Sequence, residues 1–130
     1  MNQKKNILIV EDETPLRMAL RDKLVREGFS VLEAKNGQEG LAVAVHVHPD
    51  LILLDIVMPV MDGMTMLKEL RADHWGQNAK VIVLTNLSDN DKLADAMEQG
   101  SYDYLVKSNW TIESVVAKVK DRLNAYGNPT

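Results

Sequence analysis

Acidic residues follow two of the short apolar runs in the sequence, at positions from which they could bind a cation together. Glu11 and Asp12 come directly after residues 7–10. Asp55 comes directly after residues 51–54. Carboxylates brought into a small volume would repel one another unless a cation neutralised them. A cluster of oxygen ligands suits a hard ion such as Mg²⁺, which binds carboxylates, carbonyls and water. These residues therefore predict a magnesium site.

A hydroxyl and an ammonium group complete a set that could handle a phosphoryl group. Thr85 follows the apolar residues 81–84, and Lys107 follows residues 102–106. The carboxylates, a divalent cation and Lys107 together carry a net charge of roughly zero, so the site could accept a phosphoryl group and pass it to a carboxylate nucleophile. Lys107 and the metal would neutralise charge on the phosphoryl oxygens, and Thr85 would donate a hydrogen bond to one of them.

Each of these residues also has a plain structural interpretation. A single carboxylate at the end of a strand is most often a helix cap or a turn residue, and Asp12 could simply precede a helix that starts near Thr14. Thr85 alone is typical of a strand end, and Lys107 alone of a solvated charge. The phosphoryl interpretation is favoured because compatible groups follow several strands of one predicted sheet.

The elements that must position these groups are short and strongly apolar. Residues 7–10, 51–54 and 81–84 are uninterrupted apolar runs that end abruptly in polar residues. Runs of this length suit strands that are covered on both faces, as in the interior of a parallel sheet. Two weaker strands are predicted at residues 30–34 and 102–106.

Amphipathic segments separate the strands, and each begins with a residue that can cap a helix. The predicted starts are Thr14 with Pro15 as the first helical residue, Asn36 paired with Glu39, Asp62, Ser88, and Thr111. Strands that alternate with helices over short connections indicate a parallel α/β sheet with helices on both faces. Ligands of such sheets bind beyond the carboxyl ends of the strands, where the candidate residues fall.

The composition excludes several classes of protein. The 130 residues are 45% hydrophobic and 26% charged, which fits one globular domain and is too apolar for a disordered chain. The formal charge of −4 disfavours direct binding of nucleic acid, and the absence of cysteine rules out disulfide scaffolds and thiolate chemistry. The apolar residues 7–10 are too few for a secretory signal or a membrane span. A cytoplasmic location is therefore expected.

As a set, these residues resemble the receiver domain of two-component response regulators, in particular the single-domain chemotaxis type. The resemblance rests on Glu11-Asp12, Asp55 followed by Met58-Pro59, Asp62-Gly63, Thr85 and Lys107, in matching order and spacing. It implies a single receiver domain over residues 1–130, with its core at about residues 7–123. It also implies a flavodoxin-like (βα)5 fold, a doubly wound parallel sheet with strand order 2-1-3-4-5.

The resemblance implies a role for each residue near the predicted phosphorylation site. Asp55 would accept a phosphoryl group from the phosphohistidine of a sensor histidine kinase, or from a phosphotransfer protein. Asp12, Asp55 and the backbone carbonyl of Val57 would bind Mg²⁺, while Glu11 would act through water. Lys107 would contact the phosphoryl group. The protein would then be a switch in a phosphorelay and not an enzyme, apart from catalysing its own phosphotransfer and dephosphorylation.

The same resemblance implies how the signal would leave the site. Thr85 would move toward the phosphoryl group, and Tyr104 would turn inward in response. A downstream protein would then bind over about residues 88–124. No direct contact with nucleic acid or with a membrane is expected.

Two positions depart from the family pattern. Ser108 stands where the family usually has proline after a cis peptide, and a cis bond before a non-proline residue costs about 3 kcal/mol. Either the chain accepts that strain at a functional turn, or the Lys107–Ser108 bond is trans and aims the lysine differently. Asn86 stands where the family often has a smaller residue. Together with Val57, which offers no polar group to orient an attacking water, Asn86 would tune the lifetime of the phosphorylated state.

Two other functions compete with a switch. An aspartyl-phosphate phosphohydrolase of the haloacid dehalogenase type also uses an aspartate after a strand, but it needs a second acid two residues later, where this chain has Val57. A chain of this length also leaves no room for a cap domain over a substrate. The second alternative is a receiver that acts as a protein-binding module without being phosphorylated, and the filled key positions give no reason to prefer it.

Overall fold

Five parallel strands form one sheet in the computed structural model, which describes residues 4–85, 94, 98, 103–106 and 111–124. The strand order is β2-β1-β3-β4-β5, as the sequence predicts. The flavodoxin-like fold class is therefore confirmed. The strands are β1 (Asn6–Val10), β2 (Ser30–Ala34), β3 (Leu51–Asp55), β4 (Val81–Thr85) and β5 (Asp103–Val106).

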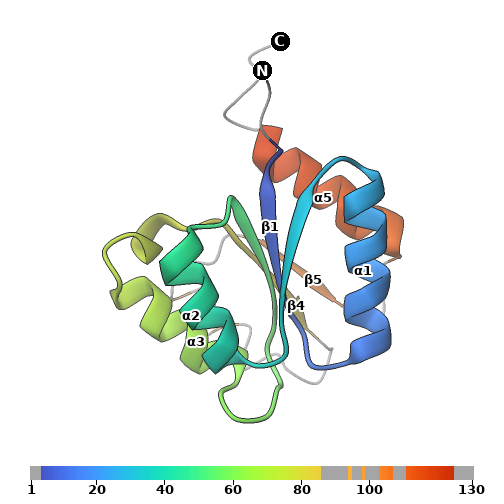
Figure 1. Ribbon diagram of the computed structural model, residues 1–130. Coiled ribbons are helices and arrows are strands. Elements are labelled where there is room, and N and C mark those ends of the chain that lie inside the picture. Colours follow the sequence, from blue (N-terminus) through green and yellow to red (C-terminus); the bar gives the residue numbers. More distant parts are fainter. Residues whose placement is uncertain (1–3, 86–93, 95–97, 99–102, 107–110, 125–130) are drawn as a thin grey trace.

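Helices cover both faces of the sheet (Figure 1). The described helices are α1 (Thr14–Arg26), α2 (Gly37–Val47), α3 (Gly63–Ala72), the short 3-10 helix η1 (Gly76–Asn78) and α5 (Ile112–Asn124). Helices α1 and α5 lie on one face, and α2 and α3 lie on the other. The helix predicted to start at Ser88 lies almost entirely outside the described residues. No helix among the described residues has the length and apolar character needed to cross a bilayer.

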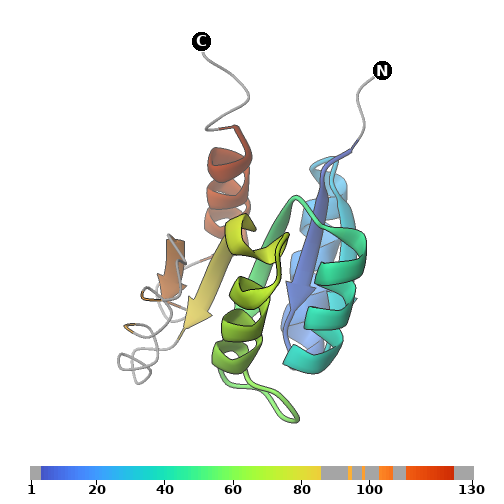
Figure 2. The same ribbon diagram turned by 90° about the vertical axis from the view of Figure 1, so that its left-hand side faces the viewer.

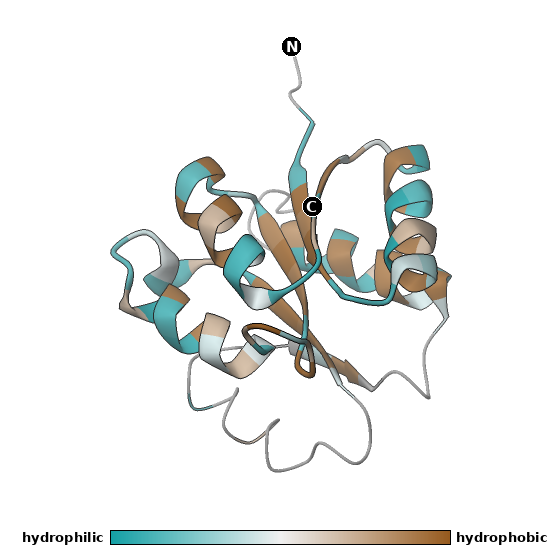
Figure 3. Cartoon of the chain, turned by 60° about the horizontal axis from the view of Figure 1, so that its bottom comes forward, coloured by the Kyte–Doolittle hydropathy of each residue, from teal (hydrophilic) through white to brown (hydrophobic). Residues whose placement is uncertain are grey.

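Alternating side chains explain why the apolar runs are uninterrupted. Along β1, Ile7 and Ile9 pack against α1 and α5, whereas Leu8 and Val10 pack against α2 and α3, and all four side chains are fully buried. Because each strand contributes to two cores, both sets of positions must be apolar. In Figure 3 the strands at the centre are coloured mainly as hydrophobic, whereas the helices around them mix hydrophobic and hydrophilic residues.

Three of the predicted helix caps are confirmed. The Asn36 side chain accepts a hydrogen bond from the Glu39 amide at 2.9 Å, and Asp62 accepts one from the Thr65 amide at 2.8 Å. Thr111 accepts one from the amide of Ser114 at 3.1 Å. Each bond satisfies an amide that the first turn of a helix leaves without an intrahelical partner.

The predicted start of the first helix is wrong by one residue. The cap of α1 is Glu13 and not Thr14, because the Glu13 carbonyl already accepts the Arg17 amide at 2.9 Å. Thr14 is therefore the first helical residue and Pro15 the second. The Glu13 side chain itself makes no capping bond. Proline fits there because amides of the first turn need no intrahelical acceptor. At the other end, Gly28 follows the helix at φ +98°, a conformation that favours glycine.

The carboxyl ends of the strands all lie at one edge of the sheet. The arrows of β1 and β4 point the same way in Figure 2, and every strand pair in the sheet is parallel. Loops that leave this edge therefore meet, although their residues are far apart in the sequence. Among the candidate residues that the structure describes, Glu11 and Asp12 follow β1 at this edge, and Asp55 and Thr85 end β3 and β4 there.

Candidate functional site

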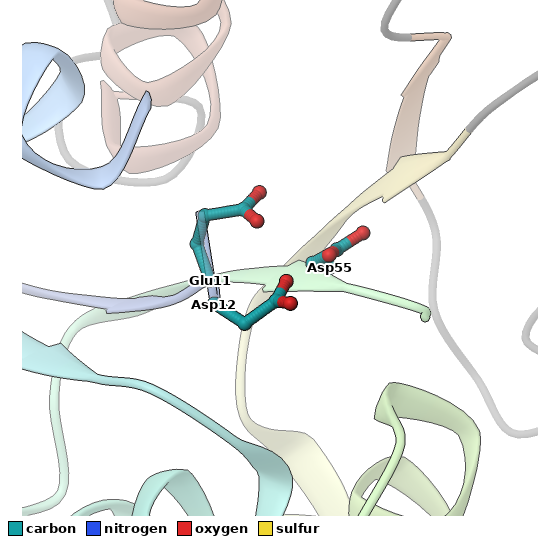
Figure 4. Close-up of side chains that lie close together, drawn as sticks. All are labelled: Glu11, Asp12 and Asp55. Atoms are coloured by element: carbon teal, nitrogen blue, oxygen red, sulfur yellow. The ribbon is translucent and has the colours of Figure 1, made fainter. Parts of the chain in front are cut away.

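Three carboxylates converge where β1 and β3 end. Glu11, Asp12 and Asp55 each place a carboxylate oxygen within 4.8 Å of the other two (Figure 4). Glu11 is fully buried and Asp55 is 4% exposed, whereas Asp12 is open to solvent. The site therefore has a closed floor and an open side.

Hydrogen bonds fix the turn that carries the first two carboxylates. The Glu11 amide donates to the carbonyl of Ala34 on β2 at 3.0 Å, which extends the pairing of β1 by one residue. The Glu11 carboxylate then accepts the Glu13 amide at 3.1 Å through Oε2. Because Asp12 lies between these two anchored residues, its position follows from theirs.

The loop after β3 is anchored by apolar side chains on either side of Val57. Ile56 and Met58 are buried in the core, and the Val57 side chain between them is 48% exposed. The Ile56 carbonyl accepts the amide of Gly63, the first residue of α3, at 2.7 Å. The loop therefore starts and ends at fixed points beside Asp55, and its middle faces solvent.

The structure gives positions for two further candidate residues. Thr85 ends β4, is 2% exposed, and lies one residue beyond the pair formed by Asp55 and Leu84 in the strand register. Tyr104 lies on β5 and is 44% exposed, so its ring is on the surface in this structure. Their roles in a switch stay predictions.

Three other candidates lie outside the described residues. They are Asn86, Lys107 and Ser108. The predicted contact of the lysine with a phosphoryl group, the tuning role of Asn86 and the isomer of the Lys107–Ser108 bond all stay predictions.

The chemistry of the donor set fits Mg²⁺. All three groups offer oxygen, which a hard cation prefers, and the exposed side at Asp12 leaves room for the water ligands that Mg²⁺ retains. Two ionised carboxylates at such a separation repel each other by about 3–4 kcal/mol at an effective dielectric constant of about 20. A divalent cation among them makes the total interaction attractive, because each carboxylate then lies closer to the doubly charged ion than to its neighbours.

One buried residue beside the site was not singled out from the sequence. Arg17 on α1 is 7% exposed and donates to the Glu11 carbonyl through Nη1 at 2.9 Å. The sequence does contain a signal for the burial of Arg17. Arg17 lies three residues before Leu20 and seven before Leu24, and this spacing places it on the buried face of the helix.

Comparison with known proteins connects this arrangement to one family. The family model of the response regulator receiver domain matches residues 7–120. The chemotaxis protein CheY of Bacillus subtilis is 35% identical over 119 residues, which are 91% of this chain and 97% of that protein. The phosphate regulon transcriptional regulatory protein PhoB of Pseudomonas aeruginosa is 36% identical over 95% of this chain, but over 53% of its own length. The chain spans about half the length of several curated relatives that it matches.

Solved structures show the same fold. A CheY-like receiver domain protein from Methanospirillum hungatei superposes with a TM-score of 0.86 at 27% identity, covering 95% of this chain and 96% of that one. The CheX–CheY–BeF3–Mg²⁺ complex from Borrelia burgdorferi superposes with a TM-score of 0.80 at 28% identity, covering 91% and 88% of the two chains. That relative was therefore crystallised with the ion that the acidic cluster described above suits.

Proposed function

Since the chain belongs to the response regulator receiver domain family, we propose that it is a phosphorylation-dependent switch of a two-component phosphorelay, with Asp55 as the phosphoacceptor. The observation that carries the proposal is the convergence of Asp55 with Glu11 and Asp12 at the carboxyl edge of the sheet. We propose that about residues 7–123 form the core of one receiver domain, because the elements that carry these groups lie within this range.

The proposed reaction transfers a phosphoryl group between proteins. A carboxylate oxygen of Asp55 attacks the phosphorus of a phosphohistidine on a sensor histidine kinase or phosphotransfer protein. The O–P bond forms as the N–P bond breaks, and the histidine nitrogen retains the electron pair of the broken bond. Mg²⁺ held by Asp12, Asp55 and the Val57 carbonyl, with Glu11 acting through water, would neutralise charge on the phosphoryl oxygens. Lys107 would do the same as a point charge.

The output of the switch is a change in conformation. Phosphorylation adds about 1.5 to 2 negative charges at one position, and it shifts an equilibrium only as far as the two states differ in their contacts with that group. We propose that Thr85, buried at the end of β4, supplies the differing contact, and that Tyr104 changes from its exposed position in response. A downstream protein would recognise the changed surface over about residues 88–124.

The formal charge of −4 supports a role without direct binding of nucleic acid. We propose that the chain acts in the cytoplasm through protein partners and has no direct contact with nucleic acid or membrane. Because the family consists of signalling domains, we assign no turnover of a metabolic substrate.

A small phosphodonor tests the proposal against its alternatives. The purified chain is incubated with acetyl phosphate and Mg²⁺, and bound phosphate is counted by intact mass. A switch takes up one phosphoryl group per chain and loses this ability in Asp55→Asn. Asp62→Asn is the matched control, because Asp62 caps α3 outside the acidic cluster and asparagine caps a helix equally well. Repeated turnover of organic phosphates would indicate a phosphohydrolase instead, and no uptake would indicate a binding module.

A further inference from the structure

Arg17 is a buried cation on a helix face that is otherwise apolar. It shares that face of α1 with Leu20 and Leu24, which are fully buried, and is itself only 7% exposed. An arginine is rarely buried to this extent unless its guanidinium group is paired. Its partners therefore indicate what the burial achieves.

The guanidinium group of Arg17 joins two strands to the helix. Nη1 donates to the backbone carbonyl of Glu11, just after β1, at 2.9 Å. Nε donates to the Glu33 carboxylate on β2 at 3.0 Å. The planar guanidinium holds both donors in fixed relative directions, so the two acceptors are held in a fixed arrangement as well.

We infer that Arg17 is a positioning residue for the metal site. The inference rests on the proposed function, because it assigns to Arg17 the arrangement of the carboxylates that would hold Mg²⁺. Three groups of Glu11 that would set its orientation are engaged: the amide by Ala34, the carboxylate oxygen Oε2 by the Glu13 amide and the carbonyl by Arg17. Without the bond from Arg17, the peptide group between Glu11 and Asp12 can change its orientation. The directions in which the Glu11 and Asp12 side chains point would then no longer be fixed.

Glu33 makes this arrangement compatible with a bound cation. A lone guanidinium so near the acidic cluster would repel Mg²⁺, but the Glu33 carboxylate offsets its charge. Glu33→Gln would keep an oxygen acceptor for Nε and leave the positive charge uncompensated. Magnesium binding in this variant should therefore weaken through repulsion, although the hydrogen bond from Arg17 Nε is kept and only the one from Arg21 is lost.

Arg21 provides a matched control on the same helix. It also donates to Glu33, at 3.3 Å, and to the neighbouring Asp22, at 3.0 Å. Within the part of the chain that the structure describes, Arg21 makes no hydrogen bond to Glu11. Arg21→Met thus removes the same charge and a contact to the same carboxylate, but leaves the turn at Glu11 intact.

Calorimetric titration with MgCl₂ tests the inference directly. Loss of a group that orients a metal ligand typically weakens metal binding 10–100-fold, so we expect the dissociation constant to rise at least about tenfold in Arg17→Met. Arg21→Met should stay within about twofold of wild type. Arg17→Lys, which keeps one charged donor, should recover part of the affinity. If Arg17→Met does not fold, as judged by circular dichroism, Arg17→Gln takes its place.

Amide exchange in metal-free protein gives a second readout. The Glu13 amide, which donates to Glu11, should exchange faster in Arg17→Met, whereas the Glu39 amide at the start of α2 should not change. Unchanged affinity for Mg²⁺ in a folded Arg17 variant overturns the inference and leaves the proposed function standing. If wild type itself binds no Mg²⁺, the proposed metal site fails and the inference fails with it.

Discussion

Gly63 lies so close to Asp55 that no other residue fits in its place without a shift of the backbone. A β-carbon built on Gly63 would be 2.1 Å from the backbone carbonyl oxygen of Asp55. The start of α3 therefore packs directly against the residue that we propose as the phosphoacceptor. This contact explains why a glycine follows the capping residue Asp62.

Gly63→Ala should disturb both stability and the site. Real β-carbons do not approach a backbone oxygen to this distance, so α3 or the end of β3 must move, at a cost of about 1–3 kcal/mol. Urea denaturation measures the cost, and titration with Mg²⁺ shows whether Asp55 has shifted. Affinity for the ion should fall together with the stability.

Gly28→Ala is the control for this prediction. Gly28 has open space around it but a φ of +98°, so alanine there costs stability through backbone strain alone. Its binding of Mg²⁺ should equal that of wild type. Equal affinities in Gly63→Ala and Gly28→Ala would contradict the proposed coupling between α3 and the site.

Val60 stores strain in the loop between β3 and α3. Its φ is +68°, which a β-branched residue rarely adopts, and its side chain is 77% exposed and packs little. The left-handed conformation costs about 1–2 kcal/mol for an L-residue, and glycine costs about 0.5–1 kcal/mol in chain entropy. Val60→Gly should therefore raise the free energy of unfolding by about 0.5–1 kcal/mol. Val60→Ala keeps the left-handed strain and should not raise the free energy of unfolding. If Val60→Gly were less stable than wild type in urea denaturation, Val60 would not be a strained position.

Val57 should lengthen the life of the phosphorylated state. It lies two residues after Asp55, is half exposed, and carries no group that could orient a water for attack on the phosphorus. A single hydrogen bond from an amide is worth about 1 kcal/mol, so Val57→Asn should speed dephosphorylation roughly fivefold. The decay of bound phosphate after removal of the donor measures this. Val60→Asn adds the same amide to the same loop and should not accelerate the decay; equal rates for Val57→Asn and wild type would refute the prediction.

Glu27 and Lys120 join the end of α1 to α5, and this pair should make stability depend on pH. The hydrogen bond from Lys120 lowers the pKa of Glu27 below its ordinary value of 4.5, with smaller help from Lys23. A carboxylate whose pKa is lower in the folded state adds stability above its unfolded pKa, and this is lost as the pH falls through the folded pKa. Lys120→Met should thus be less stable than wild type near neutral pH, and the difference should shrink below pH 4.5.

Urea midpoints across this range provide the measurement for the Glu27 pair. Lys23→Met is the companion variant, because Lys23 lies 3.6 Å from the same carboxylate and lowers its pKa less. The loss of stability in Lys23→Met should be smaller than in Lys120→Met, and it should likewise shrink as the pH falls. A deficit in Lys120→Met that persists unchanged at acid pH would show that packing, and not charge, links the helices.

The fold could be predicted because the signals that specify it are local. Each fully apolar run marks a strand buried on both faces, and Asn36, Asp62 and Thr111 mark helix starts through bonds that span three residues. Parallel strands then place their carboxyl ends together, which is why Asp12 and Asp55 could be expected to meet.

Features that depend on distant contacts could not be predicted in this way. The role of Arg17 depends on the end of β1 and on Glu33 of β2, and the helix periodicity indicates only that position 17 faces inward. The closeness of Gly63 to Asp55 likewise arises from the packing of α3 on the end of β3. The cap of α1 could not be predicted correctly, because the bond from the Arg17 amide to the Glu13 carbonyl decides it. A bond between two backbone groups leaves no signal in the sequence.

Locating the phosphoryl group on the chain tests the central claim most directly. Protein treated with acetyl phosphate and Mg²⁺ is digested, and the modified peptide is identified by fragment mass spectrometry. The modification should map to Asp55, should not form when the metal is chelated, and should be absent in Asp55→Asn. A phosphoryl group on another residue, or uptake that is unchanged in Asp55→Asn or without Mg²⁺, would contradict the account.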